Sequence, residues 1–194
     1  MIKQITPNMV INSFIEHYLK FLTETDMFRH RRFAAIELPI EVVVSGLFKG
    51  FHQEAPVVVG INSGDCGVAA IAIGWVLSHF RPDSEIVYYD NGEHAYFSMD
   101  GMFYDTICRH GKRSHVEMFG GKPEKEIKPL TLDGLCNAFI IADVQGQQMI
   151  SSFCELWGVP GICFEEYNKD LSLEDIAAEV IFTQHRRDTA IKEL

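Results

Sequence analysis

The sequence predicts an α+β domain in which a central helix packs on an antiparallel β-sheet. Three observations predict it. Residues 67–80 are apolar on nearly all sides, as in a helix that is buried on most of its surface. The segment EIVYYD at 85–90 is typical of a strand, and HAYFSMDGMFYDT at 94–106 alternates apolar and polar residues. Asp100 and Gly101 in that segment are a strong signal for a two-residue hairpin turn, so its two arms run antiparallel.

Composition favours one domain over residues 1–194, because 47% of the chain is hydrophobic and can bury a core. The formal net charge of −10 argues against a nucleic-acid or anionic-membrane partner. The chain has neither an apolar run of about 18 residues nor a signal-peptide pattern, so we expect a cytoplasmic protein. The five cysteines form no C-x-x-C pair and are odd in number, which favours reduced thiols over a disulfide framework.

The N-terminal half contains one clear helix. Apolar residues recur at three-and-four spacing over 8–24, after Pro7. Within 33–59, the segments IEVVVSGLF and APVVVGI are the best strand candidates. Beyond the hairpin, residues 111–128 are rich in Gly, Lys and His and are expected to form an exposed loop.

The C-terminal third is predicted to contain a strand and two helices. NAFIIADV at 137–144 is typical of a buried strand. A helix is expected over about 147–157, followed by a turn at 158–161. The segment SLEDIAAEVIFTQHRR then closes the chain as a helix with Ser172 as its N-cap.

The stretch NSGDCG at 62–67 interrupts an apolar run and sets Cys66 on the first turn of the central helix. The backbone N–H groups and the positive dipole end found there favour a thiolate over a thiol. Cys66 is therefore a candidate nucleophile, and the alternative is a small buried residue at a helix start. A charged Asp65 would disfavour the thiolate, unless its side chain caps the helix and turns toward the N–H groups.

A nucleophilic thiol needs a base, and the base needs an orienting acid. With a two-residue turn, position 94 lies opposite 107, so His94 and Asp105 are diagonal neighbours on one face of the hairpin. A longer, bulged loop would set them directly opposite each other. Alone, His94 could be an ordinary strand-end histidine and Asp105 a turn acid. Together with Cys66 they favour catalysis.

The segments GDCGVAAIAI and HAYFSMDGMFYDT together resemble the papain-like cysteine peptidase superfamily in its broad sense. They are similar to its compact Cys-His-Asp branch, which includes transglutaminase-like proteins and the bacteriocin-processing peptidases of ABC exporters. The resemblance implies a papain-like fold. It also implies that Cys66 is the nucleophile, His94 the general base and acid, and Asp105 the orienter.

The chain departs from the exporter peptidases at the oxyanion site. Those peptidases carry a glutamine six residues before the cysteine, where this chain has Gly60. Asn62 is the nearest side-chain amide that could donate to an oxyanion, alongside the backbone N–H of Cys66. Its alternative role is to cap its own turn.

We therefore predict a cysteine-dependent amide hydrolase, most simply a protease, that acts on a protein or peptide through a thioester intermediate. Deamidation, transglutamination and removal of ubiquitin-like modifiers use the same triad and stay open. No cofactor or metal is expected. His110 and His115, near Cys108, lack the spacing of zinc ligands and favour a solvated loop.

Two other classes of protein compete with this prediction. A nucleotide-binding α/β unit has a strand, a glycine-containing loop, a helix and a second strand in this order. This chain offers the segment VVVGI, the glycines Gly60, Gly64 and Gly67, a helix, and a strand that ends in Asp90. The glycine spacing is not G-x-G-x-x-G, however, and a hairpin follows Asp90 where a parallel sheet needs a crossover helix. The other class is a non-catalytic binding protein with a degenerate protease-like fold.

Overall fold

The computed structural model describes residues 4–24, 61–118, 121–139 and 143–164. In these ranges the chain is mixed α+β, with four α-helices and one four-stranded antiparallel sheet. The predicted α+β class is therefore confirmed. The strand candidates within 33–59 and the helix predicted after Ser172 lie outside the described residues.

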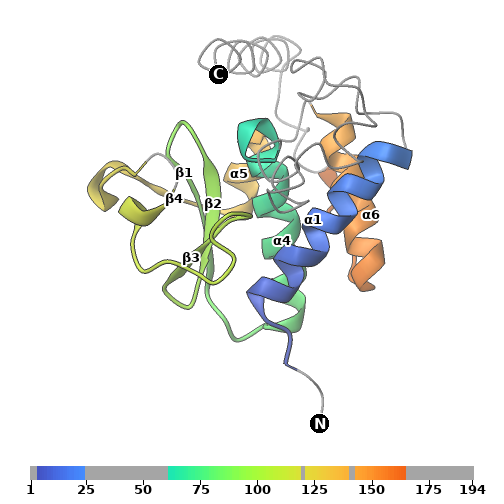
Figure 1. The fold of residues 1–194 in the computed structure, drawn as a ribbon, viewed down its shortest axis with the longest axis horizontal. Helices are drawn as coiled ribbons and strands as arrows, with labels where there is room; N and C mark the ends of the chain where they lie inside the picture. Colours follow the sequence, from blue (N-terminus) through green and yellow to red (C-terminus); the bar gives the residue numbers. More distant parts are fainter. Residues whose placement is uncertain (1–3, 25–60, 119–120, 140–142, 165–194) are drawn as a thin grey trace, which may run out of the picture.

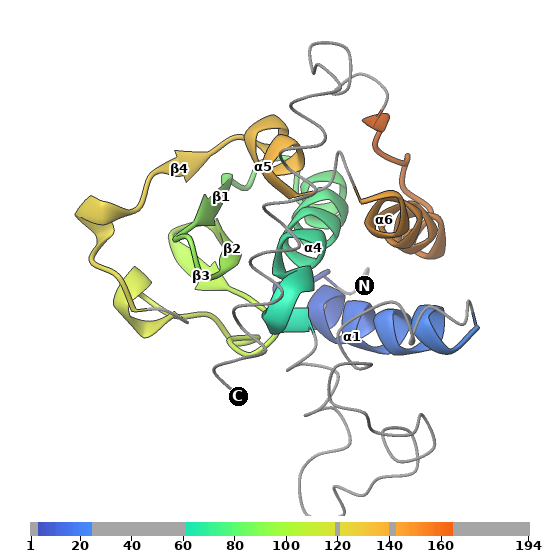
Figure 2. The same ribbon diagram turned by 90° about the horizontal axis from the view of Figure 1, so that it is seen from above.

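The helix α4 (Cys66–Phe80) forms the centre of the described fold. It confirms the helix predicted over 67–80 and is buried along most of its length, as its apolar sequence requires. The sheet lies on one side of α4, and two further helices lie on the other (Figures 1 and 2). Neither α4 nor any other helix in the described ranges combines the length and apolarity needed to cross a membrane.

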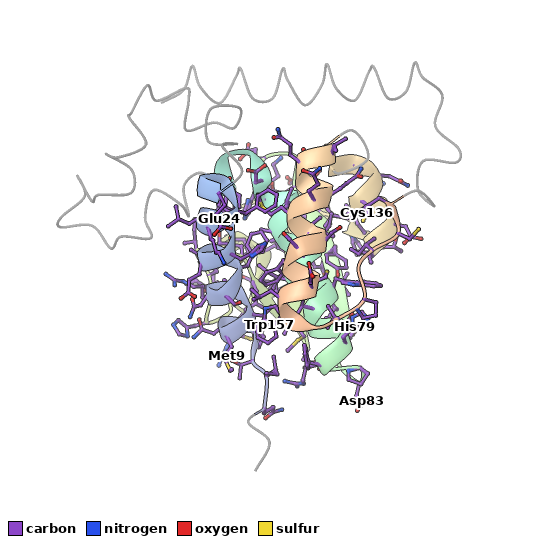
Figure 3. All side chains as sticks on the ribbon, turned by 90° about the vertical axis from the view of Figure 1, so that its right-hand side faces the viewer. Met9, Glu24, His79, Asp83, Cys136 and Trp157 are labelled. Carbon is purple, nitrogen blue, oxygen red and sulfur yellow. The ribbon has the colours of Figure 1, made fainter. Side chains whose placement is uncertain are left out.

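The two helices on the far side of α4 are α1 (Pro7–Glu24) and α6 (Val144–Trp157). They lie side by side (Figure 3). Both confirm helices predicted from periodicity. The helix α6 begins before residue 147, because the Asp143 side chain accepts a hydrogen bond from the N–H of Gly146 and caps an earlier first turn.

The sheet has the strand order β3-β2-β1-β4, and each neighbouring pair is antiparallel. Its strands are β1 (Ile86–Asp90), β2 (Ala95–Met99), β3 (Met102–Tyr104) and β4 (Pro129–Leu130). Asp100 and Gly101 have φ values of 53° and 78°, the positive values that a type I′ turn requires at both central residues. Met99 pairs with Met102, so the predicted two-residue hairpin is confirmed.

Gly74 allows α4 to lie directly against β1. A Cβ atom at position 74 would be 2.5 Å from the hydroxyl oxygen of Tyr88. No larger side chain fits there without moving the helix or the tyrosine. This contact sets the distance between the helix that begins at Cys66 and the sheet whose hairpin includes His94.

The prediction of a strand at 137–144 is wrong at both ends: its first residues belong to the helix α5 (Leu132–Phe139), and Val144 begins α6. Leu135 and Cys136 are buried, and the Thr131 hydroxyl accepts a hydrogen bond from the backbone N–H of Gly134. The start of this helix is thus stabilised by a side chain outside the apolar run. A short apolar run fits a strand or a buried helix equally well, and the threonine before it was the overlooked signal.

The segment 111–128 is irregular, as predicted, but it is not uniformly exposed. It contains two short 3₁₀ turns, His115–Glu117 and Glu124–Glu126. His115 and Met118 are buried against the sheet face that points away from α4. The expected solvated position of His115 is therefore wrong, because aromatic side chains of the sheet cover it.

Candidate active site

Cys66 is the first residue of α4, as the sequence predicts. The wide turn Ile61–Asp65 precedes it, and the backbone is kinked at Gly64, where the dihedral angles are not helical. Cys66 is 6% exposed and lies at the helix end where backbone N–H groups point outward. The position suits an anionic sulfur.

The side chain of Asp65 makes no capping hydrogen bond to α4. Its Oδ2 atom accepts a hydrogen bond of 2.5 Å from the hydroxyl of Tyr18 in α1. Both residues are buried, and the phenol offers a donor inside the interface between the helices. The carboxylate beside the thiol is therefore held by α1. No local pattern signals this contact, because the two residues are far apart in the sequence.

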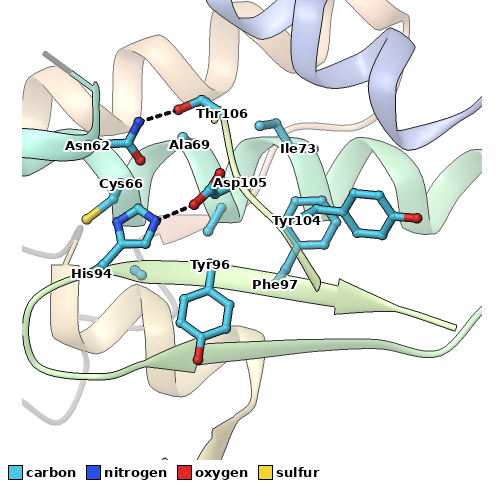
Figure 4. A pocket seen from close by; sticks show the side chains of 12 residues that line it. Asn62, Cys66, Ala69, Ile73, His94, Tyr96, Phe97, Tyr104, Asp105 and Thr106 are labelled. Atoms are coloured by element: carbon cyan, nitrogen blue, oxygen red, sulfur yellow. Dashed lines mark hydrogen bonds and ion pairs between the residues drawn. The ribbon is translucent and has the colours of Figure 1, made fainter. Parts of the chain in front are cut away.

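His94 and Asp105 flank the two strands of the hairpin and meet as the two-residue turn predicts. The Nε2 atom of His94 lies 2.9 Å from Oδ2 of Asp105, and both side chains are almost fully buried (Figure 4). The Oδ1 atom of Asp105 accepts hydrogen bonds from the backbone N–H groups of Ile107 and Cys108. The carboxylate is thus fixed on one side by the backbone and presents its other oxygen to the imidazole.

The second ring nitrogen of His94, Nδ1, faces Cys66 (Figure 4). Burial lowers the pKa of His94, but the hydrogen bond with Asp105 and the interaction with Cys66 outweigh it and raise the pKa to about 9. Burial likewise raises the pKa of Asp105, and its hydrogen bond with His94 and the two backbone donors lower it below its usual range. At neutral pH the pair is an imidazolium and a carboxylate.

Asn62 lies beside Cys66 on the wall of the same pocket. Its Nδ2 atom donates a hydrogen bond of 2.7 Å to the hydroxyl of Thr106 (Figure 4). A carboxamide nitrogen carries two hydrogens, and Thr106 accepts one of them. The amide is therefore oriented by the hairpin. Thr106 was missed in the sequence, although it directly follows Asp105.

The pocket has a volume of about 10 Å³, room for about one water molecule. Its polar end is formed by Asn62, Cys66, His94, Asp105 and Thr106. Small and aromatic side chains of α4 and the hairpin line the rest, namely Ala69, Ala70, Ile73, Ala95, Tyr96, Phe97 and Tyr104.

The structure does not support the parallel sheet of the nucleotide-binding alternative. The strand β1, which ends in Asp90, has antiparallel neighbours on both sides. The Oδ1 atom of Asp90 accepts a hydrogen bond from the N–H of Gly92 and thereby closes a turn. Gly60 lies outside the described residues. In the part of the chain that is described, no three His, Cys, Asp or Glu side chains are grouped as metal ligands.

Comparison of the chain with family models, with curated proteins and with solved structures gave no match. Any function must therefore be argued from the geometry. That geometry joins a helix-start thiol, a buried imidazole and a carboxylate, with the side-chain amide of Asn62 on the wall of the same pocket.

Proposed function

We propose that the protein is a cysteine-dependent amide hydrolase of papain-like fold, with Cys66 as nucleophile, His94 as general base and acid, and Asp105 as orienter. One observation carries the proposal: the buried His94 ring binds Asp105 through Nε2 and turns Nδ1 toward Cys66. A nucleophile, a base and an orienting acid in this relation define nucleophilic catalysis by a thiol.

The reaction begins from an ion pair, a thiolate on Cys66 and an imidazolium on His94. The raised pKa of His94 keeps the imidazolium charged at neutral pH. The sulfur then attacks the carbonyl carbon of an amide, so that a C–S bond forms and the carbonyl oxygen becomes an oxyanion. Asn62, oriented by Thr106, is the proposed side-chain donor to that oxygen.

In the second step the C–N bond breaks, the leaving amine takes the proton from His94, and a thioester remains on Cys66. Water resolves the thioester. His94 takes a proton from the water, the hydroxide adds to the carbonyl carbon, and the C–S bond breaks to give a carboxylic acid and the thiolate. Asp105 keeps the ring in one orientation throughout.

The proposed substrate is a protein or peptide, because its backbone and glutamine side chains supply the amide carbonyl that the thiol attacks. Proteolysis and deamidation share every step above and differ only in the amine that is released. The papain-like assignment rests on the central helix that begins at the thiol and on the antiparallel hairpin that positions the histidine and the acid.

Selective alkylation tests the proposal. Burial raises the pKa values of Cys108, Cys136 and Cys154 to about 11, about 12 and about 11, so these thiols react slowly at pH 7. Cys163 is exposed, and a Cys163→Ser background removes it as a competitor. In that background we expect iodoacetamide to label Cys66 first, as followed by peptide mass spectrometry.

His94→Gln is expected to slow the labelling of Cys66, because the imidazolium that stabilises the thiolate is lost. Equal labelling of all thiols, or no effect of His94→Gln, would overturn the proposal and favour a non-catalytic binding protein. Incubation with an unfolded protein then separates the reaction classes. New chain ends indicate proteolysis and conversion of glutamine to glutamate indicates deamidation, and Cys66→Ser must abolish either product.

A further inference from the structure

The far face of the sheet holds a second buried cluster that the proposed chemistry does not use. It consists of Tyr96, Phe103 and Met118, with Tyr89 and His115 packed against it. Tyr96 is completely buried and His115 is 4% exposed. Tyr96 and His115 are therefore two deeply buried titratable groups close to the candidate catalytic histidine.

Tyr96 contacts His94 directly. His94 directly precedes β2, and Tyr96 is the second residue of that strand. Their ring centroids are 6.0 Å apart and their planes are inclined by 20°. At that separation the two rings lie side by side, not one over the other (Figure 4). The contacts of His94 with Asp105 and Cys66 are made by its ring nitrogens, whereas Tyr96 lies beside the ring.

Tyr96 is in turn fixed by two neighbours. Its hydroxyl lies 2.7 Å from Nδ1 of His115, within hydrogen-bond distance. Tyr89 stacks on its ring, with centroids 5.4 Å apart and an interplanar angle of 18°. Burial lowers the pKa of His115, so that its ring is neutral at pH 7 and can accept the phenolic hydrogen.

We infer that Tyr96 is a positioning residue for His94, and that His115 positions Tyr96 in turn through the phenol. This inference rests on the proposed function of His94. The two nitrogen contacts set the direction of the imidazole within its plane, and the neighbouring phenol limits how far the ring can move out of it. A tilted ring would keep its bond to Asp105 and turn Nδ1 away from the sulfur of Cys66.

The test measures alkylation of Cys66 by iodoacetamide as a function of pH in the Cys163→Ser background. Tyr96→Leu is expected to slow labelling at pH 7 by about tenfold, less than the roughly hundredfold that a 1 Å displacement can cost. It should also shift the labelling profile to higher pH, toward that of an ordinary thiol. Tyr96→Phe keeps the ring but loses the bond to His115, so it should behave like His115→Ala and slow labelling less than Tyr96→Leu does.

Phe103→Leu is the matched control for packing. It removes a ring from the same cluster, but that ring contacts Tyr96 and His115 rather than His94. A purely structural role of Tyr96 predicts that Phe103→Leu and Tyr96→Leu lower the melting temperature alike and leave the pH profile unchanged, which would overturn the inference.

His115 supplies the second variant pair. His115→Asn places an amide oxygen near the position of Nδ1 and is expected to retain the parent pH profile, whereas His115→Ala is expected to shift it. Identical profiles for these two variants would remove His115 from the inference. If the proposed function itself were wrong, His94→Gln would leave the labelling of Cys66 unchanged. Sensitivity to His94→Gln without sensitivity to Tyr96→Leu would refute only the positioning role.

Discussion

The hydroxyl of Tyr18 in α1 donates a hydrogen bond to the carboxylate of Asp65, the residue immediately before Cys66. A negative charge next to a thiolate opposes its formation. The Tyr18 hydroxyl gives the buried Asp65 carboxylate a hydrogen-bond donor and holds it in one position. The first helix therefore contributes to the environment of the candidate nucleophile.

We predict that Tyr18→Phe slows alkylation of Cys66 at pH 7 and lowers the free energy of unfolding by about 1–3 kcal/mol, because a buried acceptor loses its donor. Urea unfolding and iodoacetamide labelling measure the two effects. Asp65→Asn is the control, since it removes the charge and keeps an acceptor. Slower labelling in both variants would contradict an electrostatic origin.

The pKa of His94 should be directly measurable. We expect the imidazole protons of His94 to titrate at about 9 in the NMR spectrum of the wild-type protein. Asp105→Asn removes the carboxylate charge and should bring the midpoint down toward 6.5, the ordinary value. A wild-type midpoint below 6.5 would mean that burial outweighs the two partners.

Stability should depend on pH in a way that identifies this pair. The pKa of His94 is raised on folding, so its contribution to stability is complete below pH 6.5 and is lost as the pH rises through about 9. The pKa of Asp105 is lowered, so its contribution is present above 3.8 and is lost as the pH falls through the folded value. Urea midpoints of His94→Gln should therefore fall less than those of wild type between pH 6.5 and 9. Parallel curves would argue against the coupling.

Asn62 can be tested by comparing two reactions of the same thiol. Attack on p-nitrophenyl acetate forms an oxyanion, whereas alkylation by iodoacetamide does not. We expect Asn62→Ala to slow acylation by on the order of 100-fold and to leave alkylation unchanged. Thr106→Val should have a smaller effect, because it only releases the amide that Thr106 orients. Equal loss in both reactions would indicate a general disturbance of Cys66.

Gly74 provides a test of the packing between helix and sheet. Gly74→Ala places a Cβ atom 2.5 Å from the Tyr88 hydroxyl and should destabilise the protein by about 1–3 kcal/mol. Gly134→Ala in α5 is the matched control, since its nearest neighbour would be 3.5 Å away. That change should be neutral or stabilising by about 0.5–1 kcal/mol through helix propensity. Thermal unfolding of the two variants measures the difference.

Local sequence patterns predicted much of this architecture. The Asp100-Gly101 turn sets the register of the hairpin, and this register alone brings Asp105 to His94. The amphipathic pattern of α1 and the apolar run of α4 likewise reflect local periodicity and burial. Such features were predictable because the residues that determine them are close in the chain.

The remaining features depend on contacts between distant residues. The pairing of Asn62 with Thr106 and the burial of His115 under Tyr96 follow from how α4 and the loop after the hairpin meet the sheet. No local pattern encodes them. The end of α5 was predicted as the start of a strand at 137–144, because a short apolar run has no periodicity that separates a strand from a buried helix.

The hairpin and α4 contribute unequally to the site. His94 and Asp105 are joined by a tight turn and can pair whenever the hairpin forms, whereas Cys66 reaches them only when α4 is seated against β1 at Gly74. The reactivity of the Cys66 thiol therefore reports whether α4 has docked against the sheet. In a population of partly folded molecules it would distinguish chains with a formed hairpin from chains with an assembled core.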